Sequence, residues 1–154
     1  MDLNALAAIE QIKQLKARYF RLMDQKHWQE WEKLFTEDVT AVYHNAPSDR
    51  SQDGLPELHC NGRANLVETV KQALSQGISM HHGHMPEIAI TSPTTARGIW
   101  AMFDYLRFPN FVFKGYGHYE EEYVKEADGW KIKSILLTRL HCDIQGEPPV
   151  SMKK

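Results

Sequence analysis

The first part of the chain carries hydrophobic residues at helical spacing. Between Asn4 and Asp24 an apolar or aromatic side chain returns every three or four positions, which is typical of an amphipathic helix that buries one face. The residues of this face are Leu6, Ile9, Ile12, Leu15, Tyr19, Leu22 and Met23. Asp2 or Asn4 can cap the helix at its start. Its solvent face is expected to carry Lys13, Lys16, Arg18 and Arg21.

Two further helices are expected, with strands between them. A short helix spans about Trp28–Phe35, and a longer one spans about Arg63–Ser75. Between them, β-branched and aromatic residues predict a strand at Val39–His44, and Leu58–Asn61 is a candidate for a second, short strand. The turn residues of Asn45–Pro56 predict a loop that is long enough to form a flap beside a pocket.

The second half of the chain is rich in strand patterns. The expected strands are Ser79–His84, Glu87–Thr91, Thr95–Phe108, Gly115–Glu126 and Trp130–Cys142. Helices followed by such a succession of strands predict an α+β fold. In this fold the N-terminal helices pack into a strongly curved antiparallel sheet, and the resulting cone encloses an apolar pocket. We expect a single domain over residues 1–145 and a loose C-terminal tail over residues 146–154.

Composition and charge narrow the classes of partner. The 154 residues have a formal net charge of −2, which provides no electrostatic footprint for nucleic acid or an anionic membrane. No apolar run is long enough for a membrane span, and the first residues lack the basic region of a signal peptide. The two cysteines, Cys60 and Cys142, fit no metal motif or disulfide scaffold. We therefore expect a cytoplasmic protein that binds neither nucleic acid nor membrane.

Four polar residues stand in segments that are otherwise apolar: Tyr19, Asp24, His81 and Arg139. Gathered in one pocket they would form an acid–base site, because such groups are costly to bury unless they are paired. The helix dipole opposes a carboxylate at the C-terminal end of a helix, so Asp24 is expected to have a distant partner. That partner is His81, whose basicity Asp24 would raise. The alternatives are a solvated Asp24 and a Tyr19 that is simply a core aromatic.

Three histidines lie close together at His81, His82 and His84. Side chains alternate along a strand, so His82 and His84 share one face and His81 takes the other. A metal site needs at least three converging ligands, and this alternation separates them. We therefore expect no metal and no other cofactor. An imidazole that titrates near neutral pH is the usual general base, and this favours catalysis for His81.

Several residues of the long strands are candidates for binding a substrate. Asp104 either pairs with Arg139 across the sheet or stays protonated as a hydrogen-bond donor, and both possibilities remain open. Trp100 and Met102 are expected to line a pocket for a flat ligand, and His118 is a candidate for a second pocket histidine. The sequence contains no nucleotide-binding fingerprint and no nucleophile elbow.

Three segments of the chain are distinctive together: Ile12–Arg21 followed by Asp24, the run Ile78–Ile88, and the closing hairpin from Tyr119 to Ile132. With the order of helices and long strands, they resemble the SnoaL-like branch of the NTF2-like superfamily over roughly residues 8–142. The first two segments look closest to bacterial bile-acid 7α-dehydratases. They are similar, more distantly, to scytalone dehydratase and lindane dehydrochlorinase.

The resemblance implies a function for the candidate residues. By it, Tyr19, Asp24 and His81 are catalytic, and Asp104 and Arg139 lie in the pocket. The expected activity is that of a cofactor-independent dehydratase, a lyase, which removes water from a small hydrophobic hydroxylated ketone of steroid-like, polyketide or terpenoid type. An enone isomerase or a polyketide cyclase would share the first proton transfer. A non-catalytic binding or assembly subunit is the third alternative. The resemblance also implies a homo-oligomer, either a dimer or a trimer.

Overall fold

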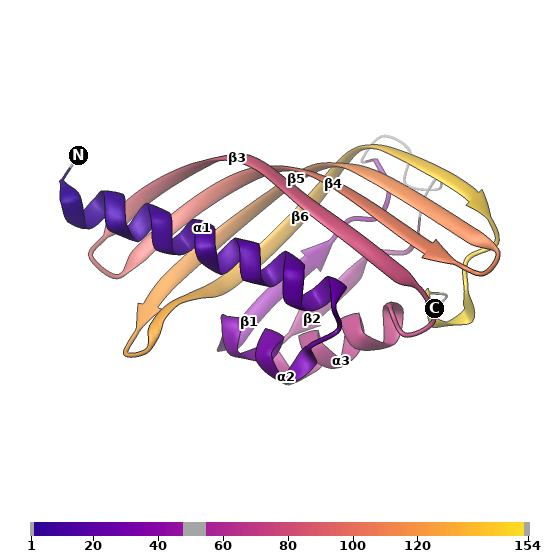
Figure 1. Cartoon of the computed structure of the whole chain (residues 1–154), viewed down its shortest axis with the longest axis horizontal. Coiled ribbons are helices and arrows are strands. Elements are labelled where there is room, and N and C mark those ends of the chain that lie inside the picture. The colour runs from indigo at the N-terminus through magenta and orange to yellow at the C-terminus, as the bar shows by residue number, and fades with distance from the viewer. Residues whose placement is uncertain (1, 48–54, 153–154) are drawn as a thin grey trace.

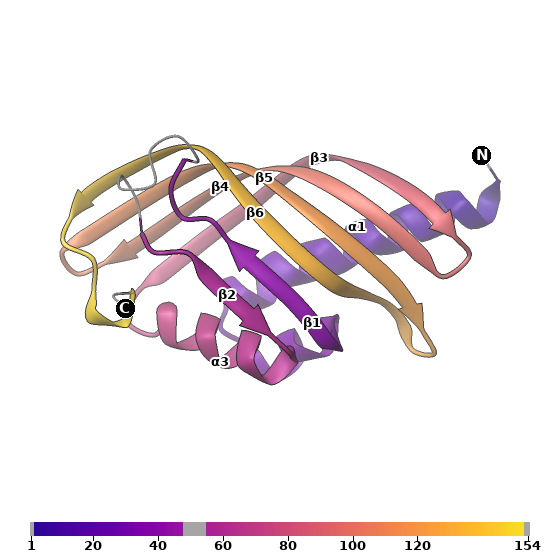
Figure 2. The same cartoon turned by 180° about the vertical axis from the view of Figure 1, so that it is seen from behind.

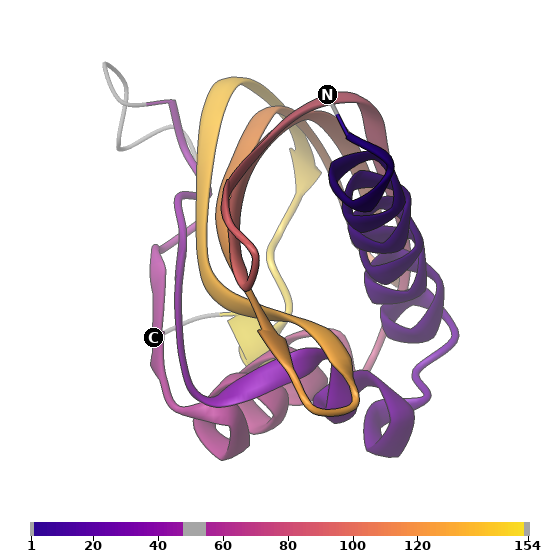
Figure 3. The ribbon, with the colours of Figure 1, turned by 90° about the vertical axis from the view of Figure 1, so that its left-hand side faces the viewer.

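The fold is a curved sheet that holds helices in its hollow (Figures 1 and 3). The structure is a computed structural model, and it describes residues 2–47 and 55–152. Most of the expected Asn45–Pro56 flap, residues 48–54, therefore lies outside the described residues. The elements are α1 (Leu3–Asp24), α2 (Trp28–Trp31), the 3-10 helix η1 (Glu32–Leu34), β1 (Phe35–Tyr43), β2 (Leu58–Asn61), α3 (Arg63–Ala73), β3 (Ile78–Ser92), β4 (Thr95–Phe108), β5 (Phe111–Glu126), β6 (Gly129–Gly146) and the 3-10 helix η2 (Val150–Met152).

The six strands form one sheet in the order β2-β1-β6-β5-β4-β3. The strands β3 to β6 follow one another as antiparallel hairpins, as predicted, and β1 pairs with β2 in the same way. The pair β1–β6 runs parallel, which corrects the prediction of a wholly antiparallel sheet. No hairpin joins these two strands, and the alternation of side chains carries no information on strand direction. The fold class itself, α+β with N-terminal helices packed into a curved sheet, is confirmed.

The helix α1 lies along the open side of the sheet, and α3 lies below β1 and β2 (Figures 2 and 3). Asp2 caps α1, because its Oδ1 accepts the backbone N–H of Ala5 at 2.7 Å. The buried face of α1 includes Ile12, Leu15, Tyr19, Leu22 and Met23, as the periodicity predicts. Lys16 is the exception: it was expected on the solvent face, and its exposed fraction is 0%. Its ion pair with Glu121 on β5, described below, accounts for this burial.

Two expected strands, Ser79–His84 and Glu87–Thr91, are parts of the single strand β3. The residues between them form a bulge, where the register against β4 shifts and Met85 adopts a φ of 32°. The strand continues through Pro86 because β3 lies at the edge of the sheet. The expected helix Trp28–Phe35 divides into α2 and η1, and β1 already begins at Phe35.

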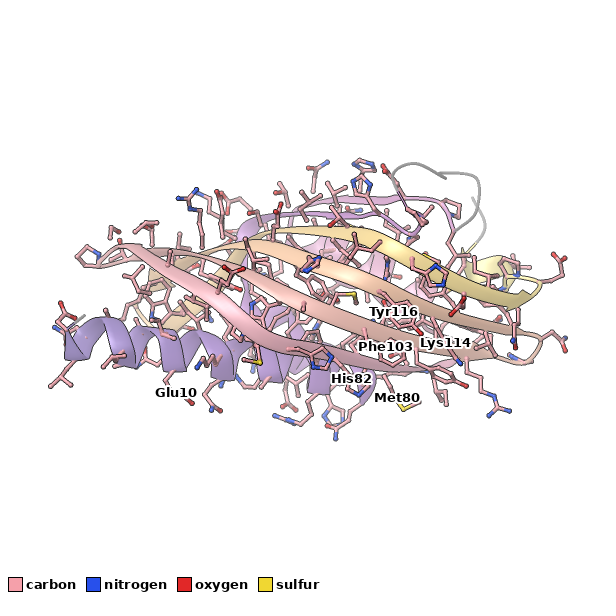
Figure 4. The ribbon with its side chains drawn as sticks, turned by 90° about the horizontal axis from the view of Figure 1, so that it is seen from above. Glu10, Met80, His82, Phe103, Lys114 and Tyr116 are labelled. Atoms are coloured by element: carbon pink, nitrogen blue, oxygen red, sulfur yellow. The ribbon has the colours of Figure 1, made fainter. Side chains whose placement is uncertain are left out.

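The outer face of the sheet carries a row of rings, which we call the ring row: His84, His82, Phe103, Tyr116 and His141. Neighbouring ring centroids in this row are 5.2 to 6.4 Å apart. Figure 4 shows the middle of the row above the strands β3 to β5. His82 and His84 thus lie on the outer face, as strand alternation predicts, and they stack on each other.

The expected homo-oligomer stays a prediction.

A bulge in β6 determines where its side chains point. Gly117 on β5 pairs with Arg139, whereas the preceding Tyr116 pairs with His141, so Leu140 is an extra residue in β6. Arg139 is buried and Leu140 is exposed. A Cβ atom on Gly117 would lie 1.9 Å from the carbonyl oxygen of Thr138, so only glycine lets the bulged strand approach so closely.

We expect Gly117→Ala to lower the free energy of unfolding by about 1–3 kcal/mol, because the new methyl group collides with backbone that cannot rotate away. Urea denaturation followed by circular dichroism measures this change. Gly98→Ala is the matched control, since its Cβ would meet side chains and no backbone: Tyr123 at 3.0 Å and Trp100 Nε1 at 3.5 Å. Equal stability of the Gly117 variant and the wild type would contradict the assigned role of this glycine.

Candidate active site

A cavity of about 190 Å³ lies between the end of α1, the helix α3 and the inner face of the sheet. Its walls are largely apolar, with Met23, Leu58, Val70, Leu74, Leu106 and Leu137 among them. The ionisable residues that face it are Tyr19, Tyr43, His81, Asp104, Tyr119 and Arg139. Ser151 and Met152 also line it, so part of the segment expected to be a loose tail contributes to the wall as η2. An apolar cavity with a few convergent polar groups is the usual form of a small-molecule site.

Asp24 ends α1 and turns its carboxylate toward β3. Its Oδ1 accepts a hydrogen bond from Ser79 Oγ at 2.8 Å, and its Oδ2 accepts the backbone N–H of His81 at 2.8 Å. Oδ1 also lies 2.6 Å from His81 Nδ1. These donors offset the unfavourable helix dipole at this position. The sequence prediction of an Asp24–His81 pair therefore matches the geometry, and Ser79 is a partner that it did not include.

The position of Asp24 determines the tautomer of His81. An ionised carboxylate only accepts hydrogen bonds, so Nδ1 carries the proton and donates it to Asp24. The lone pair is then on Nε2, on the cavity side, where Asp104 Oδ2 lies 4.0 Å away. The His81 side chain is 9% exposed, and it lines the cavity. The imidazole can therefore accept a proton from a bound molecule at Nε2 while Asp24 holds the other nitrogen.

Arg139 forms a two-pronged ion pair with Asp104 in the floor of the cavity. Its Nη1 donates to Asp104 Oδ1 at 2.7 Å, and its Nη2 donates to Oδ2 at 2.9 Å. Nε donates to the carbonyl oxygen of His44 at 3.0 Å. Burial alone would lower the pKa of Arg139, but the Asp104 carboxylate raises it above its usual value. Of the two possibilities left open for Asp104, this geometry matches the ion pair.

Gly115 makes room for this ion pair. A Cβ atom at Gly115 would lie 2.0 Å from Arg139 Nη1 and 2.4 Å from Asp104 Oδ1. The two glycines thus serve one side chain: Gly117 permits the bulge that directs Arg139, and Gly115 leaves space for its guanidinium.

Three tyrosines supply hydroxyl groups to the cavity: Tyr19 from α1, Tyr43 from β1 and Tyr119 from β5. The hydroxyls of Tyr19 and Tyr43 are hydrogen-bonded to each other at 2.9 Å. Burial raises the pKa of all three phenols above the usual value, so they keep their protons at neutral pH. Tyr43 and Tyr119 were not predicted as site residues. Each lies on the inward side of its strand, so strand alternation was the available signal.

The remaining predicted residues lie outside the cavity lining. Trp100 is on the inner face, but its Nε1 donates to the Tyr123 hydroxyl at 2.9 Å, farther along the sheet. Met102 is buried behind the ion pair, with its sulfur 3.6 Å from Arg139 Nη1. His118 is on the opposite face of β5 from Tyr119, so its assignment to the pocket is corrected. Strand alternation, which separates His118 from Tyr119, was the signal available in the sequence.

Two classes of site find no support in the part of the chain that the structure describes. Over residues 2–47 and 55–152, no three His, Cys, Asp or Glu side chains are grouped so that they would hold a metal ion. Within the same residues, none of the helices has the length and apolar character needed to cross a membrane.

Comparisons with known proteins agree with the fold. The family model described as a SnoaL-like domain matches residues 4–135. "Probable cyclase FGR4" from Gibberella zeae is 22% identical over 134 residues, which cover 84% of this chain and 89% of that protein.

Two solved structures are similar in fold. One, from Novosphingobium aromaticivorans, is provisionally named a scytalone dehydratase; it is 21% identical, with a TM-score of 0.79 and complete coverage (100%) of both chains. The other is the hexachlorocyclohexane dehydrochlorinase LinA-type3 from Novosphingobium barchaimii, 16% identical, with a TM-score of 0.75 and coverage of 97% of this chain and 100% of that chain. At these identities the likeness shows the fold alone. The closer resemblance to bile-acid dehydratases stays a prediction.

We expect Asp104→Ala to lower the free energy of unfolding by about 3–5 kcal/mol, because it leaves the guanidinium of Arg139 buried without its carboxylate. Chemical denaturation measures the change. Asp128→Ala is the control, since it removes an exposed carboxylate whose partner is Lys131 and should change stability far less. A loss for Asp104→Ala no larger than that of the control would contradict the assigned burial of this ion pair.

Proposed function

Because the chain belongs to the SnoaL-like domain family, we propose that it is a cofactor-independent lyase, a dehydratase acting on a small hydrophobic hydroxylated ketone. The observation that carries this proposal is the imidazole of His81, held by Asp24 on one nitrogen and open to an apolar cavity on the other. The names of the similar proteins, which include a dehydratase, a dehydrochlorinase and a cyclase, support an enzyme of the lyase or isomerase type.

The first step is removal of a proton from the carbon next to the substrate carbonyl. Nε2 of His81 takes this proton, and the electron pair of the broken C–H bond moves into the carbonyl to form an enolate. The imidazolium that results carries a positive charge 2.6 Å from the Asp24 carboxylate, which stabilises it. Asp24 thus acts through His81, by orientation and by charge.

The enolate oxygen needs hydrogen-bond donors, and the tyrosines supply them. All three phenols keep their protons, and the site has low polarity, where hydrogen bonds are strongest. In the Tyr19–Tyr43 pair one hydroxyl donates to the other, so the pair offers one donor to the enolate and Tyr119 offers a second. In the second step the enolate expels the hydroxyl group from the neighbouring carbon. The imidazolium or a phenol protonates this group, so it leaves as water. Arg139 is already bonded to Asp104, and its role is to orient the substrate.

The size of the cavity favours a substrate with few rings. An apolar cavity of about 150 Å³ holds a benzene molecule. The 190 Å³ here are enough for a compound of one or two rings, such as a small polyketide or terpenoid, and favour it over a steroid-like one with four.

A second candidate is a cyclase or an enone isomerase. The similarity to "Probable cyclase FGR4" favours it, and the enolate formed by His81 is an intermediate that a cyclase can also use. Both candidates begin with the same proton transfer. They differ in the product, because dehydration loses the mass of water, whereas isomerisation leaves the mass unchanged.

Exchange of the proton next to the carbonyl tests the shared step directly. We expect the wild type to exchange this proton of β-hydroxy ketones for deuterium from heavy water, followed by NMR, and to form a conjugated product seen by absorbance and mass. His81→Ala should slow exchange by about 10²- to 10⁴-fold, because the general base is gone. Asp24→Asn should slow it as well, since the amide no longer holds the required tautomer.

His82→Ala is the matched control, since this neighbour lies on the outer face of the same strand and should leave exchange unchanged. Normal exchange in His81→Ala would refute the assignment of the base. Tight binding of a ketone without exchange or product would favour the non-catalytic binding subunit.

A further inference from the structure

A buried ion pair lies between α1 and β5, and the reaction proposed above does not use it. Lys16 Nζ is 2.6 Å from Glu121 Oε1, and both side chains have an exposed fraction of 0%. Removing two charges from water is costly, and apolar residues at such positions are often as stable or more stable. A gain in stability therefore does not explain why this ion pair is buried. The residues around the pair indicate a different reason.

The ammonium group of Lys16 lies against two of the cavity tyrosines. Its Nζ is 3.8 Å from the centre of the Tyr19 ring and 3.6 Å from the centre of the Tyr119 ring. These two rings meet edge to face, with centroids 6.0 Å apart and planes at 81°. One cation thus contacts both rings, and both residues also line the cavity.

A cation over an aromatic face is attracted by the electrons of the ring. When a phenol donates its proton in a hydrogen bond to an oxyanion, negative charge builds up on the phenol oxygen and its ring. A cation in contact with the ring stabilises this charge, and in a dry interior the effect is stronger than in water. The same contact fixes the planes of the rings and, with them, the direction of the hydroxyl groups.

We propose that Lys16 is a positioning residue, held in place by Glu121, whose ammonium group orients Tyr19 and Tyr119 and strengthens them as donors to an oxyanion in the cavity. This inference rests on the proposed function, because it assumes that an oxyanion forms there. Lys16 itself is fully buried and lies behind the rings, so it acts through the two tyrosines.

The titration of Lys16 makes the arrangement sensitive to pH. Burial lowers the pKa of Lys16 to about 8, although the Glu121 carboxylate opposes this change. The titratable groups that face the ammonium are Glu121 and Tyr119 from β5 and Tyr19 from α1. Both tyrosines stay protonated there, since burial raises the pKa of each phenol well above its usual value. The cation is therefore present below pH 8, and it is lost as the pH rises further.

Dinitrophenolate is a suitable probe, because it is a flat, one-ring oxyanion that stays ionised at neutral and alkaline pH. We expect the wild type to bind it, with an affinity that falls as the pH rises through about 8. The double variant Lys16→Met/Glu121→Leu removes both charges, so neither ion is left buried without its counter-ion. Tyr123 also bonds Glu121 and keeps its hydrogen bond from Trp100 Nε1 in this variant. The variant should fold, bind the probe about tenfold more weakly at neutral pH, and show no change in affinity through this pH range.

Lys13→Met, on the exposed side of the same helix, is the matched control and should bind like the wild type. A folded double variant with wild-type affinity and pH dependence would overturn the inference, as would a wild type that does not bind dinitrophenolate. Binding does not depend on turnover, so the two proposals fail separately. If the probe binds in a Lys16-dependent way but the wild type catalyses no deuterium exchange, only the lyase proposal is refuted. If the wild type catalyses exchange but binding of the probe does not depend on Lys16, only the role of Lys16 is refuted.

Discussion

The carboxylate of Asp24 is the point on which both the fold and the candidate site depend. It joins the last residue of α1 to β3 through Ser79 Oγ, the backbone N–H of His81 and the His81 ring. The helix dipole makes this position unfavourable for an isolated Asp, so the three donors of β3 both stabilise the charge and fix the end of the helix against the sheet. The same contacts select the imidazole tautomer, so the junction of helix and strand also determines which ring nitrogen faces the cavity.

The opposite wall of the cavity depends on two glycines, which have no side chains. Gly117 allows β6 to bulge, the bulge turns Arg139 inward, and Gly115 leaves space for its guanidinium beside Asp104. The two walls meet where His81 Nε2 approaches Asp104 Oδ2 at 4.0 Å. An imidazole, a buried ion pair and protonated phenols are thus gathered from α1, β1, β3, β4, β5 and β6, and the curvature of the sheet brings them together.

Periodic patterns in the sequence were enough for α1, α3 and most strands, and polar groups in apolar segments were enough for the Asp24–His81 pair. The Asp104–Arg139 pair was one of two possibilities that the sequence left open. Other features depend on contacts between distant segments. Lys16 falls on the boundary of the polar face of α1, and its burial is explained by Glu121 and three aromatic rings that the helical pattern does not reveal. The parallel β1–β6 pair and the bulge at Leu140 likewise leave no periodic trace, because direction and register are properties of pairs of strands.

The irregular stretch of β3 at Met85 and Pro86 has a consequence for the molecule as a whole. β3 is the last strand of the sheet, and an unpaired edge presents a row of backbone groups that can recruit the edge of another molecule. Pro86 has no N–H to offer, and the bulge beside it turns the ladder out of line. This edge is therefore a poor template for strand-by-strand aggregation. The long, highly curved sheet can end at an exposed edge strand without promoting the formation of fibrils.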